Sequence, residues 1–332
     1  MTGPHRAIAA TRVAVRRALI PFDPAGLVLV ACSGGADSLA LAAAVAFEAP
    51  RAGLLAGAVI VDHDLQAGSL IAAERAADQC RWLGLDPVEV VTVEVGSSGS
   101  GSGSGSGPEA RARDARYGAF ERVLKQVGAV AVLLGHTRDD QAEQVLLGLA
   151  RGSGARSLSG MPARRGPYVR PLLDVARTTT VAACEAAGLT AWVDPHNSDP
   201  AYGRVRARGL LPVLEAELGP GTVAALARSA GLLRDDADAL DVLATAARRE
   251  IGPGRIEAAV LLRLPRAIRT RVWRLLALEA GCSPGALIST HIASLDTLVT
   301  RWRGQGPIDL PGHVQGSRID GVVFVVAIRR VE

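Results

Sequence analysis

A short turn rich in glycine and serine carries the residue types that bind phosphate. It directly follows the apolar run 27–32 and precedes a helix-like segment rich in alanine and leucine. Glycines let the backbone approach an anion closely, because no Cβ stands in the way. The N–H groups of such a turn and of the following helix start form a nest for negative charge, to which serine hydroxyls add donors. The turn therefore predicts a phosphate-binding loop. Its residues are Ser33, Gly34, Gly35, Ala36, Asp37 and Ser38.

The acidic residue inside this turn indicates a metal ion. Asp37 would repel a phosphate unless a cation lies between them, and Mg²⁺ is bound in this way by one or two carboxylates together with substrate phosphates. The turn is not a P-loop, because that motif needs GxxxxGK[ST] and Lys125 is the only lysine of the chain. It does not match GxGxxG either. A glycine turn that merely caps a helix is the structural alternative.

A second polar group follows the predicted strand 129–135. Asp139, Asp140 and Glu143 crowd the start of one helix, close after His136. Acids at a helix N-terminus are stabilised by the helix dipole, so capping is one explanation. Three acids and a histidine beside a nucleotide loop are costly unless they hold a metal ion or an amine. We therefore consider these four residues candidates for catalysis or substrate binding.

Basic residues give a weaker signal. Arg113 and Arg116 are three apart and share a helix face, where they could hold ATP phosphates or RNA, or simply face solvent. Nearly all positive charge is arginine, which suits phosphate recognition but is explained equally well by genome composition. The polar stretch 61–66, with His63, ends the second predicted strand, where polar groups of a parallel sheet face the ligand crevice or form an ordinary loop.

Strands that alternate with helices must position these residues. Such alternation predicts βαβ units and a mostly parallel, five-stranded-type sheet with helices on both faces. The predicted strands are 27–32, 57–61, 88–95 and 129–135, and the predicted helices are 69–84, 109–127 and 138–150. The Gly/Ser run 96–107 cannot pack and is expected to be a flexible loop, natural or engineered.

The 332 residues suffice for two domains. We expect a catalytic domain over 1–218, a boundary at Gly219-Pro220-Gly221, and a smaller, mainly helical α+β domain over 222–332 that ends in short strands over 307–330. No apolar stretch reaches the roughly 18 residues of a membrane span, and the N-terminus is typical of an amphipathic helix rather than a signal peptide. We therefore expect no membrane partner and a cytoplasmic location.

The four cysteines are far apart in sequence and form no CxxC pair. This spacing argues against a zinc or iron–sulfur site and favours buried free thiols in a reducing cytoplasm. They are Cys32, Cys80, Cys184 and Cys282.

The phosphate turn SGGADS resembles the SGGxDS loop of the N-type ATP pyrophosphatases, the PP-loop family. These enzymes cleave ATP between the α and β phosphates and adenylate a substrate oxygen. Further segments in order over residues 26–218 resemble the tRNA(Ile)-lysidine synthetases of this family in their short form. They are 61–66, 109–117, 135–144, 149–154, 160–161, 170–173, 194–199, 204–208 and 211–214. Asp62, Asp64 and Gln144 depart from the family pattern, and an expected asparagine is missing from 204–208.

The resemblance implies an adenine nucleotide alpha hydrolase-like fold and a two-step ligation. The C2 oxygen of the wobble cytidine in a CAU-anticodon tRNA(Ile) would attack ATP, and the amine of L-lysine would then displace AMP. ATP would be held by the loop and His63, with Asp37 on Mg²⁺. His136, Asp139, Asp140, Glu143 and Arg113 would form the catalytic group. RNA or phosphate contacts would come from Arg116, Arg151, Arg204, Arg206 and Arg208. The C-terminal domain would grip tRNA, and the resemblance is compatible with a homodimer.

Two other interpretations explain part of the sequence. Another PP-loop enzyme, such as a tRNA thiolase, an amidotransferase or an NAD synthetase, would explain the phosphate turn but not GHTRDDQAE, and a thiolase would want paired cysteines. A non-catalytic, ATP-dependent RNA-binding protein would not need the acids of both motifs.

Overall fold

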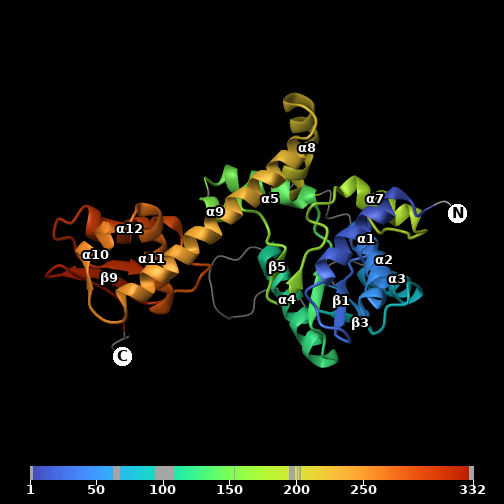
Figure 1. Ribbon diagram of the computed structural model, residues 1–332, viewed down its shortest axis with the longest axis horizontal. Helices are drawn as coiled ribbons and strands as arrows, with labels where there is room; N and C mark the ends of the chain where they lie inside the picture. Colours follow the sequence, from blue (N-terminus) through green and yellow to red (C-terminus); the bar gives the residue numbers. More distant parts are fainter. Residues whose placement is uncertain are drawn as a thin grey trace. The chain divides into compact units, whose positions relative to one another are not determined.

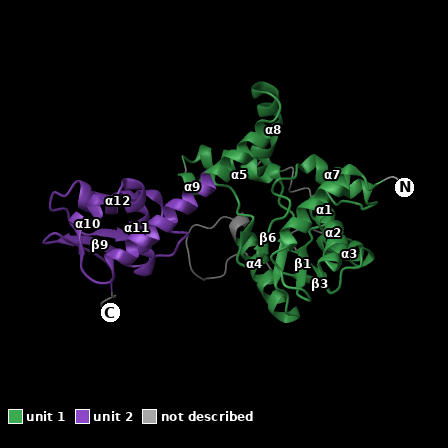
Figure 2. Ribbon diagram, viewed as in Figure 1, with its two compact units in different colours: residues 1–232 green, residues 233–332 purple. Residues whose placement is uncertain are grey.

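The computed structural model describes residues 3–62, 68–93, 108–152, 154–193, 199, 201 and 203–328. Within them the chain forms two compact units, residues 1–232 and 233–332 (Figure 2). His63, the Gly/Ser run 96–107 and residues 194–198 lie outside the described residues, so the expectations for them remain predictions.

A six-stranded, mostly parallel sheet lies at the centre of the first unit (Figure 1). The strand order is β3-β2-β1-β4-β6-β5, and among the described strands of this sheet only β5 and β6 pair in antiparallel fashion. The strands are β1 (Leu27–Ala31), β2 (Leu55–Asp62), β3 (Val88–Thr92), β4 (Ala131–Leu134), β5 (Arg164–Arg165) and β6 (Tyr168–Val169). Five strands thus run parallel, which confirms the predicted fold class, and a two-residue antiparallel edge extends them.

Helices cover both faces of this sheet because successive strand residues point to opposite sides. Val28 and Val30 of β1 are fully buried in the larger core cluster, whereas Leu29 between them is buried in a second cluster with Phe120 of α4. The larger cluster contains residues of α1, α2, α3 and α7. The helices packed on the sheet are α1 (Arg6–Leu19), α2 (Ala36–Glu48), α3 (Ser69–Trp82), α4 (Pro108–Val127) and α7 (Arg177–Ala186). Helix α5 (Arg138–Ala150) follows β4 and packs instead through Ala142 against Leu211 and Val223. A 3-10 turn, η1 (Pro50–Ala52), and a short helix, α6 (Ala155–Leu158), complete the local elements.

The N-terminal segment forms the expected amphipathic helix. Ala7, Thr11, Val15 and Leu19 of α1 are buried at a spacing of four residues, which places them on one helix face. Two arginines in its last turn match the negative end of the helix dipole.

A pair of helices follows the sheet. α8 (Gly203–Leu218) and α9 (Thr222–Ile251) are bent by 107° at the break between them. The Glu215 carboxylate accepts hydrogen bonds from the N–H groups of Gly221 and Val223, at 2.7 and 2.9 Å, and so caps α9. The helices break where Gly219-Pro220-Gly221 suggested a boundary, while the two compact units divide inside α9, after Leu232. The domain limits of 1–218 and 222–332 stay a prediction.

The second unit packs helices against a small antiparallel sheet of order β7-β10-β9-β8. Its core surrounds the fully buried Trp273, whose indole N–H donates to Asp296 at 3.1 Å. Arg269 pairs with the same carboxylate at 2.7 Å, so this buried acid is satisfied. Besides the end of α9, the elements are β7 (Ile256–Glu257), α10 (Ala258–Arg263), α11 (Arg266–Glu279), α12 (Ser289–Thr300), β8 (Ile308–Leu310), β9 (Val314–Ile319) and β10 (Val322–Ala327).

Among the described residues, no single helix has the length and apolarity to cross a bilayer, although the bent pair α8–α9 passes that test on length and composition.

Candidate active site

The phosphate turn joins the end of β1 to the start of α2. Gly34 has φ +80°, a left-handed conformation that favours glycine. Gly35 is the N-cap residue of α2 and offers no side chain to cap it. The first N–H groups of a helix lack partners inside the helix, so those of α2 remain available to an anion.

Hydroxyl groups hold the turn in shape. Ser38 Oγ accepts a hydrogen bond from the Ser33 N–H at 3.2 Å and donates to the Gly35 carbonyl oxygen at 2.9 Å. Ser33 Oγ lies 3.3 Å from Ser38 Oγ. The Ser38 hydroxyl hydrogen, which the sequence suggested for phosphate, is therefore used inside the turn.

The end of β4 comes very close to this turn. A Cβ on Gly135 would lie 3.2 Å from the backbone of Asp37 and Ser38, so any larger residue here would force these backbone segments apart by a few tenths of an ångström. The next residue, His136, is thereby brought to the same cavity as the turn. This contact joins the two motifs that the sequence placed about 100 residues apart.

One cavity of about 560 Å³ collects most of the predicted site residues. The phosphate turn lines it together with Arg116, His136, Asp140 and Arg208. Its apolar lining comes from strand ends and from α4, and includes Ala31, Val61, Phe120 and Leu134. The cavity thus offers both a surface for a planar base and groups for charged ligands.

Arg177, the first residue of α7, lies among the acids of this site. Its Nε is 3.3 Å from Asp37 Oδ2, its Nη2 is 2.5 Å from Asp140 Oδ1, and its Nη1 is 3.0 Å from Glu143 Oε1. Its backbone N–H donates to Asp139 Oδ2 at 2.8 Å. Sequence reasoning did not single out Arg177. The cation that the acids require is, in this structure, a guanidinium of the protein itself.

A second arginine shares this network. Arg208 Nε is 2.8 Å from Glu143 Oε1, and Glu143 is only 3% exposed. We expected Arg208 to bind RNA or phosphate, and the structure places it in the cavity lining while paired with this acid.

Asp140 has two structural roles. Its Oδ2 accepts hydrogen bonds from the Thr137 N–H and hydroxyl, at 2.7 and 2.9 Å, which forms a capping box at the start of α5. Burial acts to raise the pKa of this carboxyl, but Arg177 and the Thr137 N–H outweigh it, so the pKa is lowered. Capping, the structural alternative for these acids, is therefore real for Asp140 and coexists with its place in the cavity.

Asp37 differs from Asp140 in the direction of its pKa shift. Burial raises the pKa of its carboxyl, although Thr180, which donates to Oδ1, and Arg177 act in the opposite direction. A divalent cation beside it would relieve this cost. No group of three or more His, Cys, Asp or Glu side chains within the described ranges could hold a metal ion, but Mg²⁺ needs only one or two carboxylates when phosphates supply its other ligands. Asp37, at the edge of the turn, fits that requirement.

His136 is held in its neutral form. Burial lowers its pKa to about 4, Asp140 acts to raise it, and Arg170, Arg113 and Arg204 lower it further. Its Nδ1 is buried and has no hydrogen-bond partner in the structure. A neutral imidazole with an unused nitrogen at the cavity can accept or donate a hydrogen bond to a ligand.

The other predicted residues lie around this group. Arg113 donates to the Tyr117 hydroxyl at 3.2 Å and does not line the cavity. Arg206 donates to the Ala201 carbonyl oxygen at 3.0 Å. Arg151 is the C-cap residue of α5, and Arg204 lies in the first turn of α8. The four cysteines are free and buried, as predicted.

Comparison with known proteins agrees with this geometry. Residues 10–214 match the family of the PP-loop domain, so the chain is a PP-loop protein. Residues 257–330 match the TilS substrate binding domain. The tRNA(Ile)-lysidine synthase of Thermobifida fusca is 57% identical over 330 residues, which cover 98% of this chain and 100% of that protein. That of Streptomyces coelicolor is 53% identical and covers 97% and 99%. The chain belongs to the tRNA(Ile)-lysidine synthase family.

A solved structure shares the fold over about two thirds of the chain, 69%. The U34-tRNA thiolase NcsA from Methanococcus maripaludis superposes with a TM-score of 0.57 at 19% identity, covering 69% of this chain and 80% of that one. At this identity the likeness establishes the fold alone.

Proposed function

We propose that this protein ligates L-lysine to C2 of the wobble cytidine of a CAU-anticodon tRNA(Ile), with ATP converted to AMP and pyrophosphate. One observation carries the proposal: a phosphate turn without a lysine and an acid–arginine cluster face the same cavity. The relatives that cover nearly the whole chain are named for this product.

The first step needs ATP held by its phosphates. The free N–H groups at the start of α2 would bind the pyrophosphate portion as it leaves, and the apolar lining around Phe120 would receive the adenine. When bound at Asp37, Mg²⁺ would neutralise phosphate charge. The C2 oxygen of cytidine attacks the α-phosphorus, and the bond to the β-phosphate oxygen breaks.

The second step needs an amine without its proton. We assign the ammonium of lysine to the acids around Arg177, of which Asp37 and Asp140 line the cavity. Once a proton has left, the amine attacks C2 and the bond from C2 to the AMP oxygen breaks. The neutral His136, with its unpaired Nδ1, is placed to take part in proton transfer.

The RNA would be held mostly by arginine. Arg116 and Arg208 line the cavity, Arg151 is the C-cap residue of α5, and Arg204 and Arg206 lie in α8. Guanidinium groups bind phosphate in a bidentate manner and give a salt-dependent affinity. We assign tRNA contacts to the C-terminal unit as well, since it matches a substrate binding domain. Buried free cysteines agree with a reducing cytoplasm as the place of reaction.

Incorporation of labelled lysine into a CAU-anticodon isoleucine tRNA transcript tests the proposal. We expect label on the transcript only with ATP and Mg²⁺ present, and a lysine-sized mass gain on one cytidine. A transcript with another base at the wobble position is the matched control. Absence of label from the first transcript, or a sulfur-sized gain instead, would refute the assignment.

A further inference from the structure

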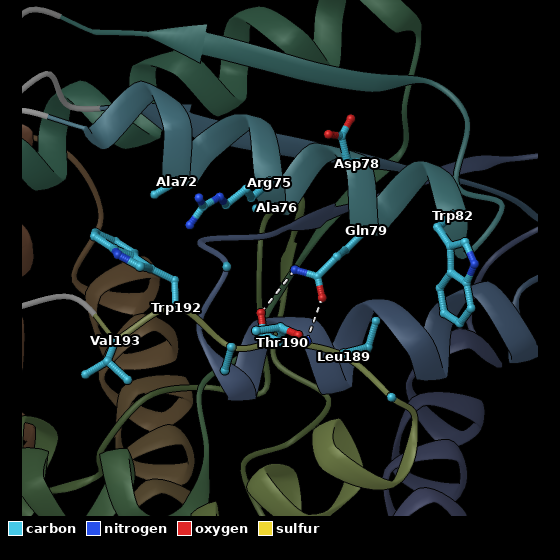
Figure 3. A pocket seen from close by; sticks show the side chains of 13 residues that line it. Ala72, Arg75, Ala76, Asp78, Gln79, Trp82, Leu189, Thr190, Trp192 and Val193 are labelled. Carbon is cyan, nitrogen blue, oxygen red and sulfur yellow. Dashed lines mark hydrogen bonds between the residues drawn. The ribbon is translucent and has the colours of Figure 1, made fainter.

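A second cavity of about 470 Å³ lies against the active-site cavity (Figure 3). One wall is α3, and the other is the extended segment 188–193, which follows α7. Four residues line both cavities: Ala72, Ala191, Trp192 and Val193. A molecule that occupies one cavity is therefore within reach of the other.

The segment 188–193 is fixed to both neighbours. The Gln79 side chain donates to the Thr190 carbonyl oxygen at 3.1 Å and accepts from the Thr190 N–H at 2.8 Å, as a strand partner would (Figure 3). The Trp192 N–H donates to the Gly34 carbonyl oxygen of the phosphate turn at 2.9 Å. The backbone of Trp192 is thus attached to the loop expected to hold pyrophosphate.

Two exposed indoles distinguish this cavity. Aromatic residues make up only 3% of the chain and include four tryptophans, yet Trp82 and Trp192 both line it. Trp82 is 72% exposed and Trp192 37% exposed. Figure 3 draws Trp192 and Arg75 toward one end of the cavity and Trp82 at the other. An exposed aromatic surface near an arginine suits an unpaired nucleobase and its phosphate, because bases of any type stack on indole.

We propose that this cavity binds the unpaired base next to the target cytidine, stacked on Trp192, with Arg75 against the backbone phosphate. The inference rests on the proposed function, since it takes the ligand of the first cavity to be a tRNA anticodon base. An RNA chain that delivers one base to the active-site cavity must place the adjoining nucleotide nearby. Trp192 lines both cavities and therefore lies where that adjoining nucleotide would be. The stacked base would also bear on the phosphate turn through the bond from Trp192 to Gly34.

A double-mutant cycle with the whole enzyme and full-length transcripts tests this pairing. Transcripts carry an abasic site on one side or the other of the wobble cytidine, and KM for the transcript is measured with wild type, Trp192→Ala and Trp192→Phe. We expect Trp192→Ala to raise KM about tenfold, the effect of losing one stacked base, and Trp192→Phe to raise it far less. For one of the two abasic positions, KM of the wild type should rise about tenfold, whereas KM of Trp192→Ala should hardly rise further.

The outcomes separate this inference from the function beneath it. Suppose that wild type labels the intact transcript, but that at both positions the abasic site raises KM by the same factor in wild type and in Trp192→Ala. The stacking proposal is then overturned, while the ligase assignment stands. If Trp192→Ala raises KM for ATP instead, the cavity belongs to the nucleotide and the proposal also falls. If wild type never labels the intact transcript, both fall. Trp82→Ala, at the far end of the cavity, is the matched control and should leave the abasic penalty intact.

Discussion

At the scale of single residues, the site consists of buried acids that form ion pairs with two arginines. Arg177 contacts Asp37, Asp140 and Glu143, and Arg208 adds a second bond to Glu143. A buried ion pair is weak support for stability, but removing one partner leaves a costly charge. Arg177 lowers the pKa of the Asp140 carboxyl in a site where an ammonium and a metal-bound phosphate would arrive. A bound ammonium would therefore compete with the Arg177 guanidinium for these carboxylates.

Asp37→Asn should abolish catalysis and spare the fold. The amide removes the charge that would attract Mg²⁺ but keeps a partner for Thr180. We expect tRNA-dependent exchange of pyrophosphate with ATP to fall at least ~100-fold, in line with the loss of a preorganised charged group. An unchanged melting temperature serves as the control, and undiminished exchange would remove Asp37 from the metal site.

Arg177→Ala should destabilise the protein by about 2–3 kcal/mol at pH 7, because acids that it pairs remain buried. The contribution of Asp140 to the pH dependence of the free energy of unfolding should also change sign. In the wild type the pKa of Asp140 is lowered, so its stabilising contribution is present above the unfolded value near 4 and is lost as pH falls through the folded pKa. In the variant, burial dominates and raises this pKa above the unfolded value, so the free energy of unfolding should rise as pH falls through the folded pKa toward the unfolded value near 4. Urea unfolding across this pH range measures both the loss of stability and its pH dependence, with Arg177→Lys as control. If the free energy of unfolding changed with pH in the same way in the variant and the wild type, the role given to Arg177 would be contradicted.

At the scale of elements, the site forms where strand ends and helix starts meet. The sequence predicted the alternating strands and helices and the phosphate turn, because apolar runs and glycine turns are local signals. It missed the two-residue strands β5 and β6, which are too short to show a period. It also missed Arg177 and Thr180, whose contact with Asp37 spans 140 and 143 residues. One signal was available: a cation at the first position of a helix is unfavourable unless acids lie beside it.

Gly135→Ala should move the end of β4 away from the phosphate turn. The new Cβ would press on the backbone of Asp37 and Ser38, so the end of β4 must move away from the turn. We expect KM for ATP to rise about tenfold or more while far-ultraviolet circular dichroism stays unchanged. Gly118→Ala is the matched control, since nothing lies within 4 Å of its Cβ position and alanine favours a helix. Equal KM values for both variants would show that the close approach is not required.

At the scale of the whole molecule, two units carry separate cores. The core of the first unit surrounds the parallel sheet, and that of the second surrounds Trp273. The chain covers the full length of the Thermobifida fusca relative. The residues matched by the PP-loop domain, 10–214, lie in the first unit, and those matched by the TilS substrate binding domain, 257–330, lie in the second.

Two cores should give two thermal transitions, of which ATP with Mg²⁺ shifts one. A ligand that binds a native unit stabilises that unit by about 2.7 kcal/mol at 100 times its Kd. Scanning calorimetry should show the shift, and tryptophan fluorescence should assign it, because Trp82 and Trp192 report the first unit and Trp273 and Trp302 the second. Asp37→Asn should reduce the shift. A single transition that moves as a whole would show that the units unfold together.

The position of Arg177 in the chain also affects when the charged site can form during synthesis on the ribosome. The aspartate of the phosphate turn is made 140 residues earlier, which corresponds to about 7–28 seconds of synthesis at ~5–20 residues per second. During that interval the emerging chain holds its carboxylates without their guanidinium. β6, at Tyr168–Val169, is synthesised only shortly before Arg177. The charged centre is therefore completed late on the ribosome, and a polypeptide released before residue 177 would lack the counterion that lets these acids be buried.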